Sequence, residues 1–243
     1  MNCAGSFTGR PAGPSTPDAM NATLSQLVQI PADTGFLEGM LELPPNARGV
    51  VLFAHGSGSS RLSPRNNFLA EKLREGHVGT LLVDLLLPAE DTVYETRFDI
   101  PLLTRRLATV AQWIAESRAA NDLPLGLFGA STGAAAALRL AGSEKAKVSV
   151  VVSRGGRPDL AGSLALRNVR APTLLIIGAE DRDVIELNRT AYESLRCEKQ
   201  IELVAGATHL FEEPGTLSTA ALLARHWFER HLCADIGTFA FMR

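Results

Sequence analysis

Short hydrophobic runs recur along the chain and alternate with longer stretches of helical periodicity. The first two runs, 24–30 and 36–43, alternate apolar and polar residues on either side of a Pro-Ala-Asp-Thr-Gly turn, a pattern that predicts an antiparallel hairpin. The later runs are apolar throughout, as is typical of parallel strands buried on both faces. These predicted strands lie at 49–55, 80–86, 125–130, 148–153, 173–177 and 200–204.

Helical spacing of apolar residues fills most segments between these strands. The clearest case is 101–118, where Leu103, Leu107 and Val110 share one face and Pro101 can open the helix. Residues 87–100 predict a loop or a short irregular segment. Further helices are predicted at 66–76, after residue 131, and at 158–166, 183–196 and 215–232. This alternation predicts an α/β fold, with a mostly parallel central sheet and helices on both faces.

Length and composition indicate one domain. The 243 residues, 46% of them hydrophobic, can build a sizeable core, and no Pro/Gly/Ser-rich linker or internal repeat divides the interior. We predict a single α/β domain over 21–233 and a C-terminal tail over 234–243. Residues 1–20 are rich in Gly, Pro, Ser and Thr and lack a basic segment followed by an apolar one. We therefore expect a disordered tail there rather than a secretory signal.

Charge and cysteine content exclude several classes of partner. The net charge of −2 and a pI near 6.2 give no bulk attraction to nucleic acid or to an anionic membrane. No apolar run approaches the roughly 18 residues of a membrane-spanning helix. Cys3, Cys197 and Cys233 are far apart and odd in number, which argues against a disulfide framework or a zinc site and favours a reducing cytoplasm. We predict no metal, no cofactor, and no nucleic-acid or membrane partner; the oligomeric state stays open.

The main chemical signal is a Gly-x-Ser-x-Gly motif at 129–133, between an apolar run and an Ala-rich helix. A sharp strand-to-helix turn at this motif would hold Ser131 at its tip, in a strained backbone conformation, where a nucleophile belongs. Glycines at 129 and 133 let the strand and the helix approach closely. Short motifs also arise by chance, and a serine at a tight turn can simply cap a helix. The flanking strand and helix favour the nucleophile.

A serine nucleophile needs a base, and the base needs a carboxylate to fix its tautomer. Asp181 and His209 follow the predicted strands 173–177 and 200–204, so both should reach the same edge of the sheet as Ser131. We predict that Ser131, Asp181 and His209 form a catalytic triad. The alternatives for the acid are Glu180 and Asp183, and those for the base are His55, His77, His226 and His231.

Stabilisation of the reaction's oxyanion calls for two backbone donors. The residue after the nucleophile, Thr132, would supply one N–H group. The small-residue loop after the predicted strand 49–55 should supply the second, and Ser57 is our candidate because His55-Gly56-Ser57-Gly58 resembles the His-Gly loop of esterases. The alternative is that this loop is only a flexible turn.

With these residues identified, the chain resembles the α/β-hydrolase superfamily and, within it, the dienelactone hydrolase-like group. The resemblance extends from about 24 to 232, uses the order serine, acid, histidine, and includes the segments 55–66 and 153–159. Members of this branch are sometimes fused to a phosphoribosyltransferase-like domain, which we do not expect within these residues. The dienelactone hydrolases use a cysteine nucleophile, whereas position 131 is serine. The resemblance therefore implies a general carboxylester hydrolase that cleaves small esters or lactones without a cofactor.

Two features bear on the substrate. About twenty residues separate the predicted strands 148–153 and 173–177, too few for a large lid domain. We therefore expect a fairly open site, with any partial cover coming from shorter loops, chiefly 87–100. Arginines also gather at predicted strand ends, and Arg61, Arg154 and Arg157 are candidates for binding an anionic group of the substrate. The alternative is that they are solvated or paired with Asp84, Asp99 or Asp159.

Three other functions compete with ester hydrolysis. A thioesterase would use the same residues. A non-catalytic receptor or ligand-binding homologue could retain the triad, since a fold alone does not define a function. A nucleotide phosphate loop at 126–133 is a poor match, because the segment has no Gly-x-Gly-x-x-Gly and no lysine after its glycines.

Overall fold

A computed structural model of the chain describes residues 22–33 and 35–232. The predicted tails at 1–20 and 234–243, together with Cys3 and Cys233, lie outside the described residues. The assignment of one domain to 21–233 stays a prediction.

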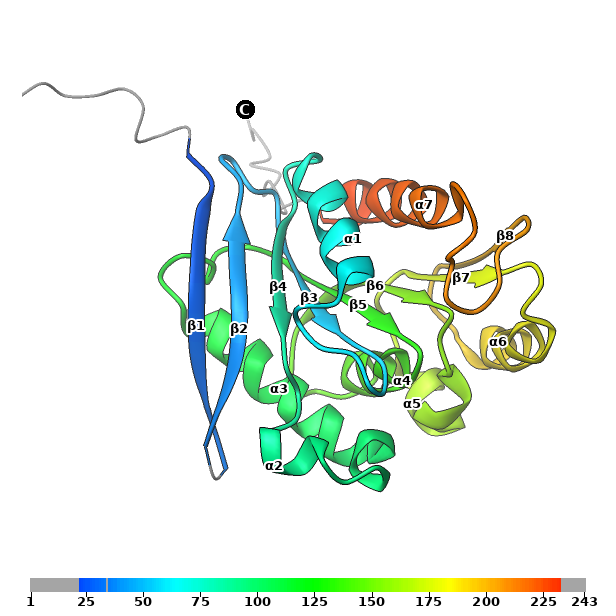
Figure 1. The fold of residues 1–243 in the computed structure, drawn as a ribbon, viewed down its shortest axis with the longest axis horizontal. Helices are drawn as coiled ribbons and strands as arrows, with labels where there is room; N and C mark the ends of the chain where they lie inside the picture. The colour runs from blue at the N-terminus through cyan, green and yellow to red at the C-terminus, as the bar shows by residue number, and fades with distance from the viewer. Residues whose placement is uncertain (1–21, 34, 233–243) are drawn as a thin grey trace, which may run out of the picture.

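The strands form one mixed sheet in the order β1-β2-β4-β3-β5-β6-β7-β8 (Figure 1). Strand β2 runs antiparallel to β1 and β4, and all other neighbours are parallel. The mostly parallel sheet expected from the apolar runs is therefore confirmed. The strands are β1 (Leu24–Ala32), β2 (Gly35–Leu43), β3 (Val50–Ala54), β4 (Gly79–Val83), β5 (Leu125–Ala130), β6 (Val148–Arg154), β7 (Thr173–Gly178) and β8 (Lys199–Val204).

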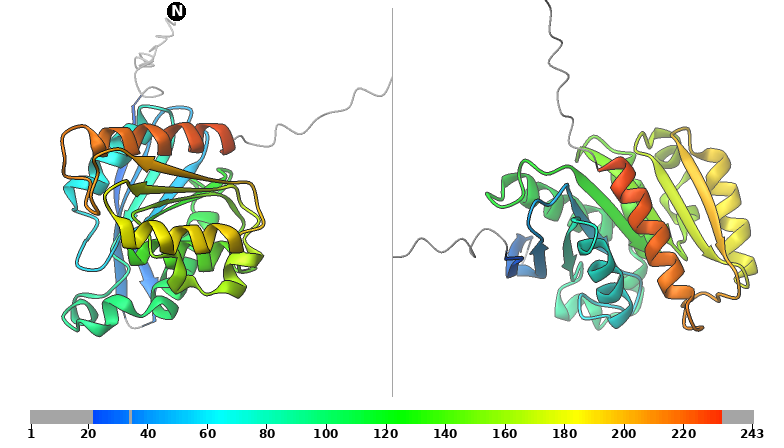
Figure 2. Two further views of the ribbon diagram at one scale, coloured as in Figure 1. Left: turned by 90° about the vertical axis from the view of Figure 1, so that its right-hand side faces the viewer. Right: turned by 90° about the horizontal axis from the view of Figure 1, so that it is seen from above.

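Helices cover both faces of the sheet and enclose two separate hydrophobic cores (Figure 2). Alternate residues of one strand enter different cores: Val50 and Leu52 of β3 pack on one face, and Val51 and Phe53 pack on the other. This is why the central strands are apolar throughout. Helices α1 (Pro64–Arg74) and α7 (Thr216–His231) lie on one face, and α3 (Ile100–Glu116), α4 (Thr132–Ala141), α5 (Ser163–Asn168) and α6 (Arg182–Ser194) lie on the other.

Three segments differ from the sequence prediction. The predicted helix 158–166 is divided into a 3₁₀ helix, η3 (Pro158–Ala161), and α5, because Gly162 takes a φ of 86° between them. The segment 87–100 contains two short helices, α2 (Pro88–Asp91) and η2 (Glu95–Phe98). Strand β4 ends at Val83 rather than at residue 86, and the carboxylate of Asp84 instead contacts the loop after β3.

The order of the strands creates a crevice at the carboxyl end of the sheet. From β3 the chain crosses to β4 on one side and then returns to β5 on the other, so β3 lies at a topological switch point, where α/β proteins bind ligands. Between β6 and β7 the chain holds only η3 and α5, so no large lid domain covers this edge.

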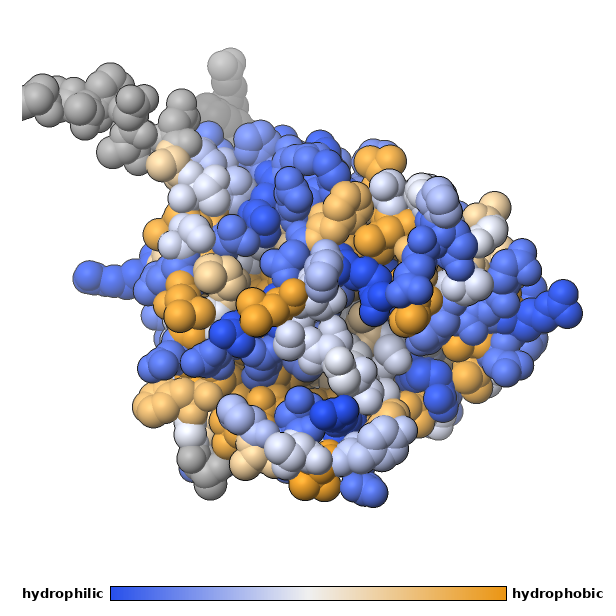
Figure 3. Space-filling model, viewed as in Figure 1, coloured by the Kyte–Doolittle hydropathy of each residue, from blue (hydrophilic) through white to orange (hydrophobic). Residues whose placement is uncertain are grey.

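The surface is mixed in polarity on the face that Figure 3 draws. On the face drawn in Figure 3, hydrophobic side chains form several separate groups among hydrophilic ones, and pale residues of intermediate hydropathy cross the centre. None of the helices in the described part of the chain combines the length and hydrophobicity that a membrane crossing requires.

Candidate active site

Ser131 lies at the tip of the turn between β5 and α4, in a strained backbone conformation. Its φ of 50° and ψ of −122° fall outside the regions that L residues ordinarily adopt. The turn brings the start of α4 against the end of β3, and a Cβ added to Gly133 would lie 2.1 Å from the carbonyl oxygen of Ala54. Glycine at 133 is thus a steric requirement for this turn.

Asp181 and His209 come together at the ends of β7 and β8. His209 Nδ1 lies 2.7 Å from Asp181 Oδ2, within hydrogen-bond distance. The two loops are also joined through their backbones, because the N–H of Glu180 donates to the carbonyl of Ala207. The carboxylate of Asp181 is 14% exposed and the imidazole of His209 is 40% exposed. If Nδ1 carries the proton and donates to Asp181, Nε2 is left free to accept a proton.

Ser131 and His209 line the same cavity, of about 250 Å³. No hydrogen bond joins Ser131 to His209 among the residues that the structure describes. Proton transfer from the Ser131 hydroxyl to the His209 imidazole needs an oxygen–nitrogen distance of roughly 2.6–3.2 Å. Such catalytic contacts are often longer until substrate binds. The cavity is lined by Gly56, Ser57, Ser59, Ser63, Arg65, Asn66, Ala130, Ser131, Arg154, Gly155, His209 and Leu210.

The competing histidines have other surroundings. His55 Nδ1 lies 3.1 Å from its neighbour's carbonyl at Gly56, and His77 Nδ1 lies 3.2 Å from the carbonyl of Pro45. His231 packs on Trp227. None of these three lines the cavity of Ser131.

The loop after β3, residues 55–63, lies against the nucleophile turn. A Cβ at Gly56 would lie 2.9 Å from the Cβ of Ser131. The N–H of Ser57 donates to the side-chain oxygen of Thr132 at 3.1 Å, whereas the N–H of Thr132 has no hydrogen-bond partner among the described residues. The two predicted donors are therefore neighbours, and Ser57 would have to exchange the Thr132 hydroxyl for a developing oxyanion.

The cavity has positive and no negative side chains. Arg65, Arg154 and His209 are its ionisable residues, and no carboxylate is among the lining residues. Arg65 reaches outward to pair with Glu212 at 2.7 Å. Arg154 has no ion-pair partner within the described part of the chain, so an anion entering the cavity would find an uncompensated charge.

Arg154 is the unusual member of this group, because its guanidinium is buried without a counter-ion. The residue is only 7% exposed, and Nε and Nη1 have no hydrogen-bond partner among the described residues. Its guanidinium lies 5.7 Å from the centre of the Phe211 ring. Burial, followed by the nearby charge of Arg65, lowers the pKa of Arg154 to about 10, which leaves it cationic at neutral pH.

The other two candidate arginines are paired and lie outside this cavity. Arg61 is bound by Asp84 and by Glu38. Arg157 forms two hydrogen bonds with Asp159, at 2.8 and 2.9 Å, and the bonded carboxylate raises the pKa of Arg157. Ion pairing, the alternative expected from the sequence, thus describes Arg61 and Arg157, and only Arg154 retains a free guanidinium near Ser131.

Asn66 was not predicted as a site residue. It is buried at the start of α1 and lines the cavity, and its Oδ1 has no hydrogen-bond partner among the described residues. The sequence predicted a helix from residue 66 but could not show which side of its first turn faces Ser131. Residues 87–100, which the sequence analysis expected to cover the site, do not line this cavity.

No group of three or more His, Cys, Asp or Glu side chains suited to a metal ion occurs in the described ranges. The arrangement around Ser131 consists of a strained hydroxyl, an imidazole paired with a carboxylate, and an unpaired backbone N–H. These are the parts that acyl transfer through a serine requires.

Solved hydrolase structures resemble the chain along most of its length. A dienelactone hydrolase from Anabaena variabilis is 46% identical, with a TM-score of 0.83 over 86% of this chain and 98% of that one. A carboxyl esterase from Tuber melanosporum is 17% identical, with a TM-score of 0.69 over 86% of this chain and 88% of the other. An esterase from Pyrococcus furiosus is 16% identical, with a TM-score of 0.70 over 92% and 98%. These last two show similarity of fold alone.

Two curated proteins from different strains of Mycobacterium tuberculosis are each 52% identical over 206 residues, and their names describe them provisionally as phosphoribosyl transferases. The alignment covers 85% of this chain and 46% of theirs, so the chain spans about half the length of these relatives. No family model matches the chain.

The burial of Arg154 predicts a gain in stability when its charge is removed. An unpaired buried cation carries a desolvation cost that an apolar side chain of similar length avoids. We expect Arg154→Met to raise the free energy of unfolding by about 1 kcal/mol or more, measured by urea denaturation. Arg157→Met, which breaks a partly exposed ion pair, should lower it by less than about 1 kcal/mol. A clear loss of stability in Arg154→Met would mean that this arginine is a structural residue.

Proposed function

Because the chain belongs to the dienelactone hydrolase-like group of the α/β-hydrolase superfamily, we propose that it is a serine hydrolase which cleaves small carboxylic esters or lactones. The reaction passes through an acyl-enzyme intermediate. The observation that carries the proposal is the 2.7 Å contact between His209 and Asp181 at a cavity that also holds the strained Ser131.

Acylation begins when Ser131 Oγ attacks the ester carbonyl carbon while His209 Nε2 accepts the hydroxyl proton. Asp181 orients the imidazole and stabilises its charged form. The N–H groups of Thr132 and Ser57 stabilise the negative oxygen of the tetrahedral intermediate. The intermediate collapses as the bond to the alcohol oxygen breaks, and the protonated His209 gives its proton to the leaving alcohol.

Deacylation repeats the sequence with water as the nucleophile. His209 removes a proton from water, the resulting hydroxide attacks the acyl carbon, and Ser131 leaves with the proton returned by His209. A thioester follows the same steps with a thiol as the leaving group, so thioester hydrolysis is an alternative activity of the same residues.

The provisional name of the mycobacterial relatives does not fit this site. More than half of each relative lies outside the aligned region. We infer that the name phosphoribosyl transferase describes the unaligned part of these relatives, since the aligned part corresponds to a chain that is similar to a dienelactone hydrolase. The chemistry proposed for Ser131 therefore applies to the shared half.

An anionic group on the substrate is part of the proposal, and Arg154 is the residue that binds it. The residue is only 7% exposed, lines the cavity of Ser131 and has no counter-ion among the described residues, and no carboxylate lines that cavity. Because Arg154 lines the cavity, a substrate carboxylate there could accept a charge-assisted hydrogen bond from its guanidinium. Of the three arginines that the sequence suggested for this role, only Arg154 remains a candidate.

Replacement of Ser131 by alanine tests the nucleophile. We expect Ser131→Ala to lower kcat for a p-nitrophenyl acyl ester by at least about 10⁴-fold, because no covalent intermediate can form. Ser59→Ala is a matched control, because Ser59 lines the same cavity and takes no part in the proposed steps, and it should retain most of the activity. An unchanged rate in Ser131→Ala would refute the assignment. A wild-type protein that turns over no member of an ester and thioester panel, yet melts at higher temperature with a ligand, would favour the receptor alternative.

A matched pair of esters tests Arg154. One ester carries a terminal carboxylate on the acyl chain, and the other carries a neutral group of the same size. For Arg154→Met we expect kcat/KM to fall about 10- to 100-fold for the anionic ester, as the loss of a charged hydrogen bond predicts, and to change little for the neutral one. Arg157→Met serves as the control and should leave the ratio of the two esters unaltered. Equal losses on both esters in Arg154→Met would exclude recognition of an anion.

A further inference from the structure

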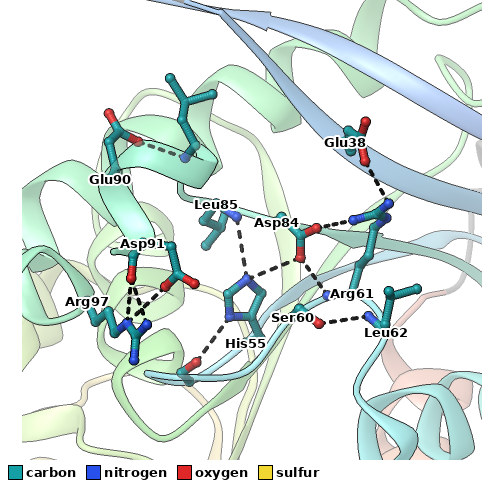
Figure 4. Close-up of polar contacts among 12 residues, drawn as sticks. Glu38, His55, Ser60, Arg61, Leu62, Asp84, Leu85, Glu90, Asp91 and Arg97 are labelled. Carbon is teal, nitrogen blue, oxygen red and sulfur yellow. Dashed lines mark hydrogen bonds and ion pairs between the residues drawn. The ribbon is translucent and has the colours of Figure 1, made fainter. Parts of the chain in front are cut away.

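We propose that Asp84 is a positioning residue that holds the loop 55–63, and with it the Ser57 donor, in place beside Ser131. The inference rests on the proposed function, since it concerns a donor of the same reaction. Asp84 acts through two residues of that loop, Arg61 and His55, and through its neighbour Leu85 (Figure 4).

The order of the strands explains why this loop needs support from two sides. Strand β3 lies between β4 and β5, so the loop that follows it passes between the carboxyl ends of both neighbours. On the β5 side, the N–H of Ser57 is held by the hydroxyl of Thr132 at 3.1 Å. On the β4 side, the contacts come from Asp84 and Leu85, directly after the end of β4.

Asp84 holds the far end of the loop through Arg61. Its Oδ1 accepts the backbone N–H of Arg61 at 2.6 Å, and its Oδ2 accepts a hydrogen bond from Arg61 Nη1. The guanidinium also donates to Glu38 of β2 at 2.6 Å, which fixes the same side chain from the next strand (Figure 4). Both carboxylate oxygens of Asp84 are thus engaged with one loop residue.

The near end of the loop is held at His55. The N–H of Leu85 points to His55 Nε2 at 3.5 Å, and Asp84 Oδ1 lies 3.8 Å from the same nitrogen. His55 Nδ1 lies 3.1 Å from the carbonyl of Gly56, the residue before Ser57. Consecutive residues at the end of β4 therefore contact both ends of the segment that contains Ser57.

Asp84 and Arg61 do not line the cavity that Ser131 lines. Asp84, Arg61 and Glu38 line a separate cavity of about 320 Å³, whereas Ser57 lines the cavity of Ser131. The side chains of Arg61 and Asp84 are only 19% and 23% exposed, so their ion pair is screened less than one at the surface. Asp84 therefore acts on the position of the donor and not on the reacting atoms.

Comparison of Asp84→Ala with a matched ion-pair variant tests the inference. Glu42 pairs with Arg74 at 2.8 Å, with side chains 22% and 19% exposed, and neither residue lines the cavity of Ser131. We expect Asp84→Ala to lower kcat for a neutral p-nitrophenyl ester by about 10- to 100-fold, approaching the loss of one oxyanion donor, with KM changed by less than about threefold. Glu42→Ala should leave kcat near the wild-type value at a similar melting temperature.

A trifluoromethyl ketone analogue provides a second readout, because its hemiketal oxygen occupies the oxyanion position. Its affinity should fall in Asp84→Ala by the same factor as kcat and should stay constant in Glu42→Ala. Asp84→Asn retains an oxygen for the Arg61 N–H and should recover part of both losses, and it replaces Asp84→Ala if the latter does not fold.

The outcomes separate this inference from the proposed function. If the wild type hydrolyses esters through Ser131 and folded Asp84 variants keep the same activity, the role of Asp84 is overturned and the proposed function stands. Equal losses of kcat in the Asp84 and Glu42 variants would also overturn it, since they would show a general effect on stability. A wild-type protein without hydrolytic activity would overturn both proposals.

Discussion

The strained turn at Ser131 is the constraint on which the rest of the site depends. A residue with a φ of 50° is held against its own preference only because β5, α4 and the end of β3 pack around it, and this packing requires that Gly133 carry no side chain. The same close approach brings the loop 55–63 beside Ser131 and Thr132. The position of Ser131 beside its two candidate donors, Ser57 and Thr132, therefore follows from one packing arrangement.

His209 and Arg154 line the same cavity but differ in whether a carboxylate balances their charge. The imidazole of His209 lies against the carboxylate of Asp181, which would balance the charge of a protonated base. Arg154 has no such partner among the described residues, and we expect its buried guanidinium to lower the free energy of unfolding. A buried cation in the cavity of Ser131 is understandable if, as proposed, a substrate anion provides the missing partner. The positive arginines beyond the cavity, Arg61 and Arg157, are neutralised by nearby carboxylates.

Much of the fold was predictable because buried parallel strands leave uninterrupted apolar runs. The candidate residues Ser131, Asp181 and His209 were chosen because each follows one of those runs, and the structure places Ser131 and His209 in one cavity. The errors have local causes. Leu85 and Leu86 continue the apolar pattern of β4, but the chain leaves the sheet at Asp84, whose carboxylate binds the loop after β3. Gly162 divides a predicted helix. Which arginines are paired, and which side of α1 faces Ser131, depends on contacts between distant segments, and residue patterns do not contain that information.

Covalent labelling with a fluorophosphonate, followed by peptide mapping, tests the central claim most directly, because this probe reacts with a serine only where a base and oxyanion donors activate it. Trypsin releases Ser131 in the peptide 119–139. We predict one adduct per chain, located on Ser131 and absent after heat denaturation. An adduct on another residue of the native protein, or no adduct in a protein shown to be folded, would contradict the account.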